Sequence, residues 1–312
     1  MNQNNYKDIF NTEEVDLKMV FYFFWDKKLI ISYFTIFAAV ISVLYALYLP
    51  NIYKSSALLS PSSIEKNLTN KLSAFSSVAS FTGINLPSGQ ATKTQEAVYR
   101  INSFDFFNEY FLPNIQLEDL MAIKKWNLNN NIITYDSDFY IQEKNQWVRD
   151  VSYPLTARPS AQEAYRKYKN IMNVSIDDET SFVTISIENL SPILAKNWID
   201  IIISGINLSM RNEDTEDALN SIEYLKEQAQ ITNIQSIQES ISGLMESQLH
   251  TLMLASSTKD YIFTAIESPI IPELKFAPNR AFICIFGTIL GFISSLVCLF
   301  SIGYIKNETR RF

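Results

Sequence analysis

Two uncharged apolar runs stand near the two ends of the chain. The first covers residues 29–49, reads LIISYFTIFAAVISVLYALYL, and is followed directly by Pro50. The second covers residues 281–305 and contains no charged residue either. An α-helix needs about 20 apolar residues to cross the hydrocarbon core of a bilayer. The pattern therefore predicts two transmembrane helices, at 29–49 and 281–305.

Two other interpretations of these runs are weaker. Buried core helices of this length normally carry a polar stripe, and neither run has one. A cleaved signal peptide would have a shorter apolar run and a shorter leader than the 28 residues before the first run. We therefore expect an uncleaved anchor.

Basic residues indicate the orientation of the two predicted spans. They precede the first run and follow the second, which favours both ends of the chain in the cytoplasm. These basic residues are Lys18, Lys27, Lys28, Lys306, Arg310 and Arg311. The expected order is a cytoplasmic leader at 1–28, an external domain at 50–279 between the spans, and a cytoplasmic tail at 306–312.

A period of two in hydrophobicity marks the clearest strands of the external domain. Apolar and polar residues alternate over 172–176 and over 183–187, which predicts two strands with one buried face each. The polar residues 177–180 between them predict a hairpin. Ser191-Pro192 is typical of a helix N-terminus. The remaining expected elements are a strand at 51–60, helices at 96–111 and 161–169, and an irregular segment at 112–160.

The stretch after this hairpin predicts a long helix over about 214–256. Acidic residues at 213–217 suit a helix N-terminus, and no proline occurs from Ile193 to Ser268. Such a helix would be about 65 Å long, so we expect its apolar stripe to pack against another chain. The alternative is two shorter helices folded on each other and broken near Gly243. The stripe residues expected to mediate assembly are Ile234, Ile237, Ile241 and Leu244.

A proline-rich segment precedes the second predicted span, and a pair of glycines lies inside it. Residues 267–280 contain Pro269, Pro272 and Pro278, which favour a stiff, extended backbone and predict a rigid strut between the domain and the membrane. Gly287 and Gly291 form a GxxxG pattern inside the span, which allows close helix–helix approach. We expect self-association through this pattern.

Composition and the absence of known motifs argue against several classes of function. The 312 residues carry a net charge of −7 and the pI is about 5.0, which argues against a nucleic-acid partner. The chain has one histidine and two cysteines, and Cys284 and Cys298 both lie in the second run, so no disulfide is expected in the external domain. No phosphate loop, GxSxG, HExxH or CxxC motif occurs. We therefore predict no enzyme, no catalytic residue, no cofactor and no metal.

Several stretches together resemble the Wzz chain length determinants, the polysaccharide co-polymerases of bacterial inner membranes. One is VSIDDETSFVTISIENLSPILAKNWID (174–200), with its hairpin, Ser-Pro and tryptophan. The others are SVASFTGINL (77–86), YLKEQAQITNI (224–234) and MLASSTKDYIFTAIESPIIPE (253–273). Residues 112–160 have no clear counterpart in the family.

The resemblance implies an α+β fold, in which an α/β base domain lies near the membrane and a long helix protrudes. It also implies a ring-like homo-oligomer in the periplasm that has no enzymatic activity. In that family the protein sets the modal number of repeat units that a Wzy-type polymerase adds. The absence of a C-terminal kinase domain points to the O-antigen or common-antigen type.

The resulting hypothesis is a regulator of lipopolysaccharide O-antigen chain length. Its expected partners are other copies of itself, the Wzy-type polymerase and the growing lipid-linked glycan. The alternative is a capsule or exopolysaccharide export co-polymerase that bridges to an outer-membrane channel.

Overall fold

The computed structural model describes residues 24–62, 93–127, 130–231, 234–257 and 259–308, with side chains up to residue 302. They belong to two compact units, Met1–Asn51 with Phe276–Phe312 and Ile52–Lys275. Most of the leader expected at 1–28, part of the tail expected at 306–312 and the stretch 77–86 lie outside the described residues.

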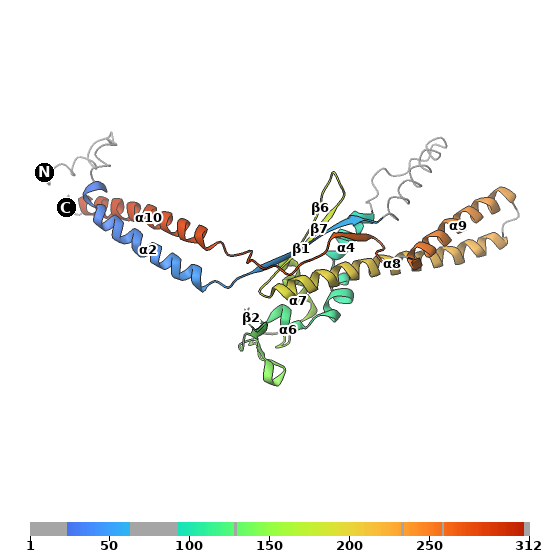
Figure 1. The fold of residues 1–312 in the computed structure, drawn as a ribbon, viewed down its shortest axis with the longest axis horizontal. Helices are drawn as coiled ribbons and strands as arrows, with labels where there is room; N and C mark the ends of the chain where they lie inside the picture. The colour runs from blue at the N-terminus through green and yellow to red at the C-terminus, as the bar shows by residue number, and fades with distance from the viewer. Residues whose placement is uncertain (1–23, 63–92, 128–129, 232–233, 258, 309–312) are drawn as a thin grey trace. The chain divides into compact units, whose positions relative to one another are not determined.

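The first unit contains two long apolar helices, α2 (Lys28–Tyr48) and α10 (Arg280–Glu308) (Figure 1). Both are long and apolar enough to cross a membrane, and only 17% and 11% of their apolar windows are buried. A core helix would instead bury one face. The helices predicted at 29–49 and 281–305 are therefore confirmed as helices.

The second unit is built on a four-stranded antiparallel sheet in the order β6-β7-β1-β8. The hairpin predicted between 172–176 and 183–187 is confirmed as β6 and β7, and the strand expected at 51–60 is β1. The outer strand β8 comes from the C-terminal part of the unit. The four strands are β1 (Tyr53–Pro61), β6 (Met172–Ile176), β7 (Val183–Asn189) and β8 (Phe263–Glu267).

The register of the sheet follows from its alternating apolar residues. Ala57 of β1 lies opposite Ile185 of β7, and both side chains are buried. Val183 and Ile187 are buried on the same strand, because side chains two apart share one face of a sheet. A one-residue slip would move this apolar set to the other face, so the pairing is specified by the core.

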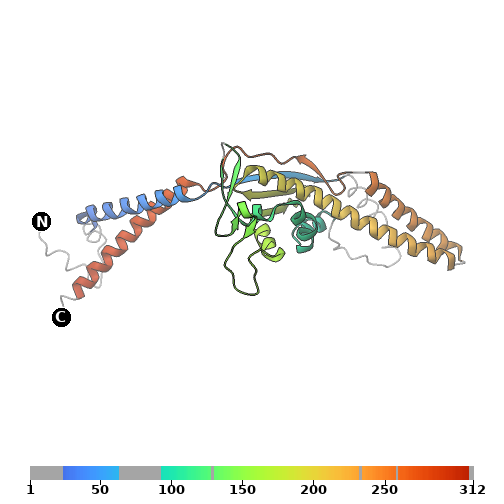
Figure 2. The same ribbon diagram turned by 90° about the horizontal axis from the view of Figure 1, so that it is seen from below.

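Helices cover the buried face of the sheet, as Figure 2 shows for the longest of them, α8 (Pro192–Ile231). Trp198 of α8 packs against Phe111, and Phe111 packs against Tyr168 with ring centroids 4.7 Å apart. These rings and the aliphatic residues of the sheet form one core. The other helices of this layer are α4 (Lys93–Ile101), α5 (Phe104–Phe106), the π-helix η1 (Phe107–Phe111) and α7 (Ala161–Ile171).

Two helices were predicted in this layer, and one of them differs. The helix expected at 161–169 is confirmed as α7. The helix expected at 96–111 is divided, because α4 ends at Ile101 and the Ser103 hydroxyl accepts a hydrogen bond from the Phe106 N–H at 3.1 Å. Ser103 therefore caps a new helix.

The segment 112–160 was expected to be irregular but contains short elements. Over the described residues 112–127 and 130–160, these form two small hairpins and three short helical turns. In chain order these are η2 (Leu112–Asn114), α6 (Leu117–Met121), β2 (Ile123–Asn127), β3 (Ile132–Tyr135), β4 (Tyr140–Ile141), η3 (Gln142–Lys144) and β5 (Gln146–Trp147).

The single helix predicted at 214–256 is wrong. α8 starts at Pro192 and ends at Ile231, and α9 (Gln235–Ser257) folds back along it (Figures 1 and 2). The alternative of two helices folded on each other is correct, but the break was expected near Gly243, which lies inside α9; α8 ends at Ile231 and α9 begins at Gln235. The phase of the apolar stripe changes at this point of the sequence, so one straight helix would leave part of the stripe unburied.

Asn207 fastens α8 to the edge strand of the sheet. Its side-chain oxygen accepts hydrogen bonds from the N–H groups of Ile262 and Phe263 at 2.8 and 3.0 Å, and its amide donates to the carbonyl of Phe263 at 3.1 Å. The side chain is 3% exposed. A buried polar group of this kind is tolerated because its hydrogen bonds are satisfied.

We predict that Asn207→Ala lowers the free energy of unfolding by about 3 kcal/mol, because it leaves buried backbone groups near β8 without partners. Chemical denaturation of the full chain in detergent, followed by far-UV circular dichroism, measures this loss. Asn212→Ala on an exposed position of the same helix is the control and should change stability by less than about 0.5 kcal/mol. Equal effects of the two substitutions would contradict the role given to Asn207.

Candidate functional site

The two glycines of the second apolar helix face the first apolar helix of the same chain. A Cβ atom built at Gly287 would lie 2.4 Å from the Cβ of Ser42, and one at Gly291 would lie 2.3 Å from the Cβ of Ala38. Larger side chains at these positions would therefore collide with α2. The close approach that the GxxxG pattern predicts occurs between α10 and α2, and self-association through it remains a prediction.

Arg280 holds the same two helices together at one end. Its guanidinium donates to the backbone carbonyls of Ala46 and Leu49 at 3.1 and 3.4 Å and to the side-chain oxygen of Asn51 at 3.1 Å. The last carbonyls of a helix have no partner within the helix. Arg280 thus caps the C-terminus of α2 from the first residue of α10.

We predict that Gly291→Leu separates α2 from α10 and destabilises the pair by about 1–3 kcal/mol, as overpacking does. Cys284 lies on α10 and is partly covered, so its reaction with a maleimide in detergent should become faster. The assay is carried out in a Cys298→Ser background. The matched control is Ser294→Leu, which adds the same side chain at an exposed position of α10. An unchanged labelling rate in Gly291→Leu would show that the glycine contact is dispensable.

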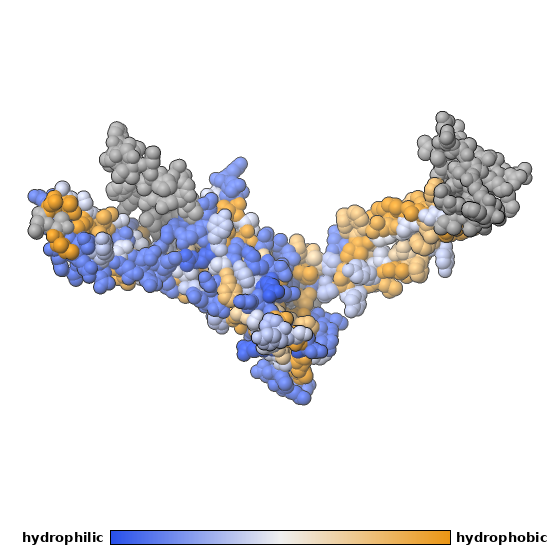
Figure 3. Space-filling view, turned by 180° about the vertical axis from the view of Figure 1, so that it is seen from behind, coloured by the Kyte–Doolittle hydropathy of each residue, from blue (hydrophilic) through white to orange (hydrophobic). Residues whose placement is uncertain are grey.

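The apolar residues expected to mediate assembly differ in their exposure. Ile241 is buried between α9 and α8, whereas Ile234, Ile237 and Leu244 are 59%, 43% and 54% exposed. Figure 3 shows apolar residues at the free end of the hairpin as well as over α2 and α10. One residue of the predicted stripe therefore closes the hairpin, and three remain available to another molecule.

In the segment predicted to be a strut, residues 268–279 between β8 and α10 form neither a helix nor a regular strand. Pro269 and Pro272 belong to the second unit, and the Ser55 hydroxyl of β1 donates to the carbonyl of Ile270 between them at 2.7 Å. Pro278 belongs to the first unit. The rigidity expected of this segment remains a prediction.

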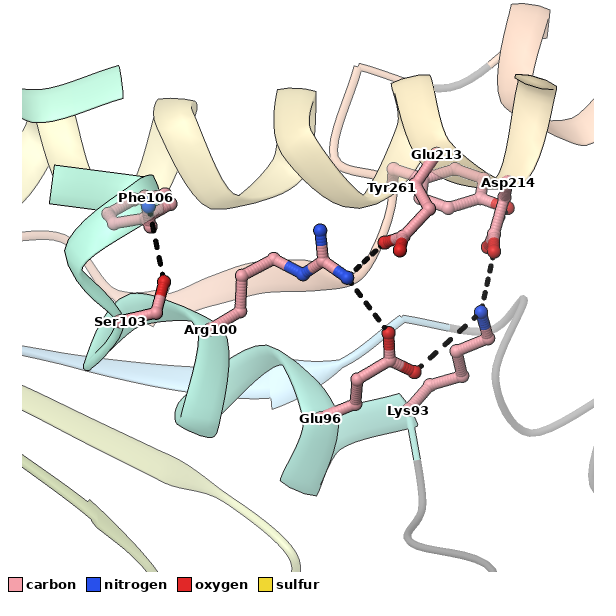
Figure 4. Close-up of polar contacts among 8 residues, drawn as sticks. All are labelled: Lys93, Glu96, Arg100, Ser103, Phe106, Glu213, Asp214 and Tyr261. Carbon is pink, nitrogen blue, oxygen red and sulfur yellow. Dashed lines mark hydrogen bonds and ion pairs between the residues drawn. The ribbon is translucent and has the colours of Figure 1, made fainter. Parts of the chain in front are cut away.

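A cluster of ion pairs joins α4 to the middle of α8 (Figure 4). Lys93 contacts Asp214 at 2.5 Å, and Arg100 pairs with Glu213 and, at 3.2 Å, with Glu96. The acidic residues at 213–217 were expected to mark a helix N-terminus, but this expectation is wrong. α8 is already helical there, and two of the carboxylates are neutralised by cations more than 100 residues earlier.

Asp214 also accepts a hydrogen bond from the Tyr261 hydroxyl at 2.8 Å, so it links three segments of the second unit. Burial alone would lower the pKa of Lys93. The hydrogen bond to Asp214 and the negative charges of Asp214, Glu96 and Glu213 together raise this pKa by more, so its net shift is upward. Burial and the Asp214 carboxylate both raise the pKa of Tyr261. Lys93 therefore stays charged and Tyr261 stays neutral at physiological pH.

A second ion pair fixes the loop before α7. Arg149 contacts both carboxylate oxygens of Glu163 at 2.8 and 3.1 Å and donates to the carbonyls of Thr156 and Ala157 at 2.8 and 2.9 Å. Glu163 also forms a capping box with Ser160. The hydrogen bond from Arg149 holds the pKa of Glu163 below its usual value, and the Ser160 N–H adds to this effect. We call Arg149, Glu163 and Ser160 the loop brace.

Because the pKa of Glu163 is lowered by folding, the brace stabilises the protein above pH 4.5, and the stabilisation is lost as the pH falls through the folded-state pKa. Glu163→Gln keeps a capping side chain but loses the charge, so we predict a loss of about 2 kcal/mol at pH 7. The difference between the wild type and this variant should shrink from pH 6 to pH 3 in denaturation experiments. Glu143→Gln, at an exposed position, is the control, and a pH-independent difference would contradict this account.

The acidic hairpin loop is organised by the chain itself. The Asp177 carboxylate accepts hydrogen bonds from the Glu179 N–H, the Thr180 N–H and the Thr180 hydroxyl at 2.8–3.1 Å, and the bonds from Thr180 chiefly lower its pKa. Within the described ranges, no group of three or more His, Cys, Asp or Glu side chains gathers where it could hold a metal ion. The polar clusters of the second unit thus serve identifiable structural contacts.

Residues 13–110 match the family model described as Wzz, chain length determinant protein. The resemblance to the Wzz chain length determinants is therefore confirmed over this part of the chain, which carries α2, β1 and α4.

Solved structures of polysaccharide co-polymerases are also similar to this chain. One, a full-length bacterial polysaccharide co-polymerase, is 13% identical with a TM-score of 0.40, and the match covers 95% of this chain and 99% of that chain. Another, a fragment of the polysaccharide co-polymerase WzzB from Salmonella Typhimurium, is 10% identical with a TM-score of 0.29, and the match covers 73% of this chain and all of that chain. No curated protein matches.

Proposed function

We propose that this protein regulates the modal chain length of the O-antigen of lipopolysaccharide and acts as an oligomeric scaffold on a Wzy-type polymerase. The observation that carries the proposal is the match of residues 13–110 to the chain length determinant family. α2 and α10 anchor the protein in the bacterial inner membrane, and the second unit lies in the periplasm.

The exposed apolar residues of the α8–α9 hairpin support an oligomeric scaffold. Ile234, Ile237 and Leu244 lie on α9 or at its start and remain exposed in the single chain. Apolar side chains of this size favour burial by about 1.5–3 kcal/mol each, and contact with a second copy removes them from water. The cluster around Asp214 fixes the part of α8 from which the hairpin extends.

The scaffold works without a reaction of its own. A ring of copies presents the same surface many times beside the polymerase and limits how many repeat units are added before the glycan is released. Chain length then depends on the geometry of the assembly and on contacts between the glycan, the polymerase and the second unit.

Deletion of the gene tests this proposal. We predict that the deleted cells lose the modal band pattern of their O-antigen in gel electrophoresis and that the wild-type gene restores it. A triple variant in which Ile234, Ile237 and Leu244 are replaced by serine should be present in the membrane but restore the pattern poorly. It should also show less cross-linked oligomer.

The control variant replaces the exposed Ser240 and Ser242 of α9 by alanine, which leaves the apolar residues intact. An unchanged O-antigen distribution after deletion would refute the proposed function. If the protein instead co-purifies with an outer-membrane channel and its loss stops export without changing chain length, the capsule or exopolysaccharide role is favoured.

A further inference from the structure

A cavity of about 810 Å³ lies in the second unit, away from the α8–α9 hairpin, and is lined by residues of the segment from Leu112 to Ala161. Its volume is within the range of about 300–1,000 Å³ that is common for small-molecule sites. The polar residues that line it are Gln116, Glu118, Asn145 and Arg158, and Trp147 and Pro159 contribute to its apolar wall. We call this cavity the segment pocket.

The wall of the segment pocket is held in place by contacts inside the segment. Trp147 packs on Tyr140 with ring centroids 5.1 Å apart. The Tyr140 hydroxyl donates to the side-chain oxygen of Asn145 at 2.7 Å, and Asn145 adopts a left-handed backbone conformation with φ 48°. The loop brace fixes the other side, because Arg149 binds the carbonyls of the two residues before Arg158. The pocket is therefore organised before any ligand binds.

Several polar groups of the pocket are not used by the fold. Within the described part of the chain, no hydrogen bond engages the side chains of Gln116 or Arg158 or the indole N–H of Trp147, and the Asn145 amide nitrogen is likewise unengaged. Gln116 and Arg158 are exposed, so the packing of the core does not require these two side chains. These groups can donate hydrogen bonds to a ligand without breaking a contact of the protein.

This combination of groups suits the chemistry of a sugar chain. An indole ring offers an apolar surface with a polar edge, and the carbon-bound hydrogens of a sugar ring form an apolar face of similar size. The amide and guanidinium donors suit the hydroxyl groups around the ring. One acidic and one basic side chain, Glu118 and Arg158, line the pocket, so its charge is balanced and favours a largely neutral ligand.

We infer that the segment pocket binds a short stretch of the polysaccharide whose length the protein regulates. The choice of a saccharide rests on the proposed function, whereas the pocket and its unengaged donors are properties of the structure. The segment lies beyond residues 13–110, which match the chain length determinant family. The pocket thus gives this chain a contact with its own glycan that is independent of Ile234, Ile237 and Leu244 on the α8–α9 hairpin.

Binding of released oligosaccharides to the full chain in detergent tests the inference. The probes are fragments of one to four repeat units, released by mild acid from the surface polysaccharide of the same cells, and calorimetry measures their Kd. The double variant Gln116→Ala, Arg158→Ala removes two exposed donors and should raise Kd at least about tenfold. Trp147→Leu should raise it similarly. The matched control is Trp126→Leu, because Trp126 contacts Tyr53 and Asn131 outside the pocket, and it should bind like the wild type.

Unchanged binding by the double variant, or no binding by the wild-type chain, would overturn the inference. The double variant is decisive if Trp147→Leu fails to fold, because its two side chains make no contact that the fold requires. In cells, a deletion that leaves O-antigen length unchanged defeats the proposed function. A deletion that abolishes the modal pattern, together with a double variant that restores it fully and binds normally, defeats only the pocket.

Discussion

The α8 helix is a core helix over its first half and an extension over its second half, and this division determines the architecture of the second unit. From Pro192 to Met210 it buries a full apolar face, whereas beyond Met210 only Ala218 is buried. The contacts that fix its direction therefore lie near the boundary. Asn207 binds the edge strand there. About two turns further along α8, Glu213 and Asp214 form ion pairs with Arg100 and Lys93 of α4. The buried asparagine supplies directional bonds that an apolar residue could not.

In the first unit, α2 and α10 are held together by close backbone packing and by a capping arginine rather than by a large apolar core. Between helices that are long and apolar enough to cross a membrane, close packing and satisfied polar groups are the attractions that a bilayer leaves. The glycines of α10 let its backbone approach Ser42 and Ala38, and Arg280 satisfies the last carbonyls of α2. Both devices act within one chain. The helix pair is thus a structural element in its own right.

The sequence predicts those elements whose signal is local. Alternation of apolar residues is sufficient for β6 and β7, and Ser191-Pro192 marks the start of α8 because capping depends on neighbouring residues only. The reversal after Ile231 was placed wrongly, since a hairpin and a single helix share the same helical period. The prediction of a helix N-terminus at the acidic residues 213–217 is wrong for a related reason. Their partners Lys93 and Arg100 are more than 100 residues away, and no local pattern reveals such a pairing. The GxxxG pattern predicted a close contact but not that its partner was α2.

The contacts that shape the segment pocket are separate from the contacts that fix α8 on the sheet. Its side chains come from three short stretches, 112–118, 145–147 and 158–161. These stretches share no recognisable spacing, so the sequence alone could not bring them together. Yet the contacts that shape it are short in range: Arg149 binds residues no more than 14 positions away, and Tyr140 contacts Asn145 and Trp147. Changes in these residues can reshape the pocket while Asn207 and the Asp214 cluster keep α8 in place. Under the proposed function, this separation lets the glycan contacts of the pocket diverge while the exposed apolar residues of the α8–α9 hairpin stay unchanged.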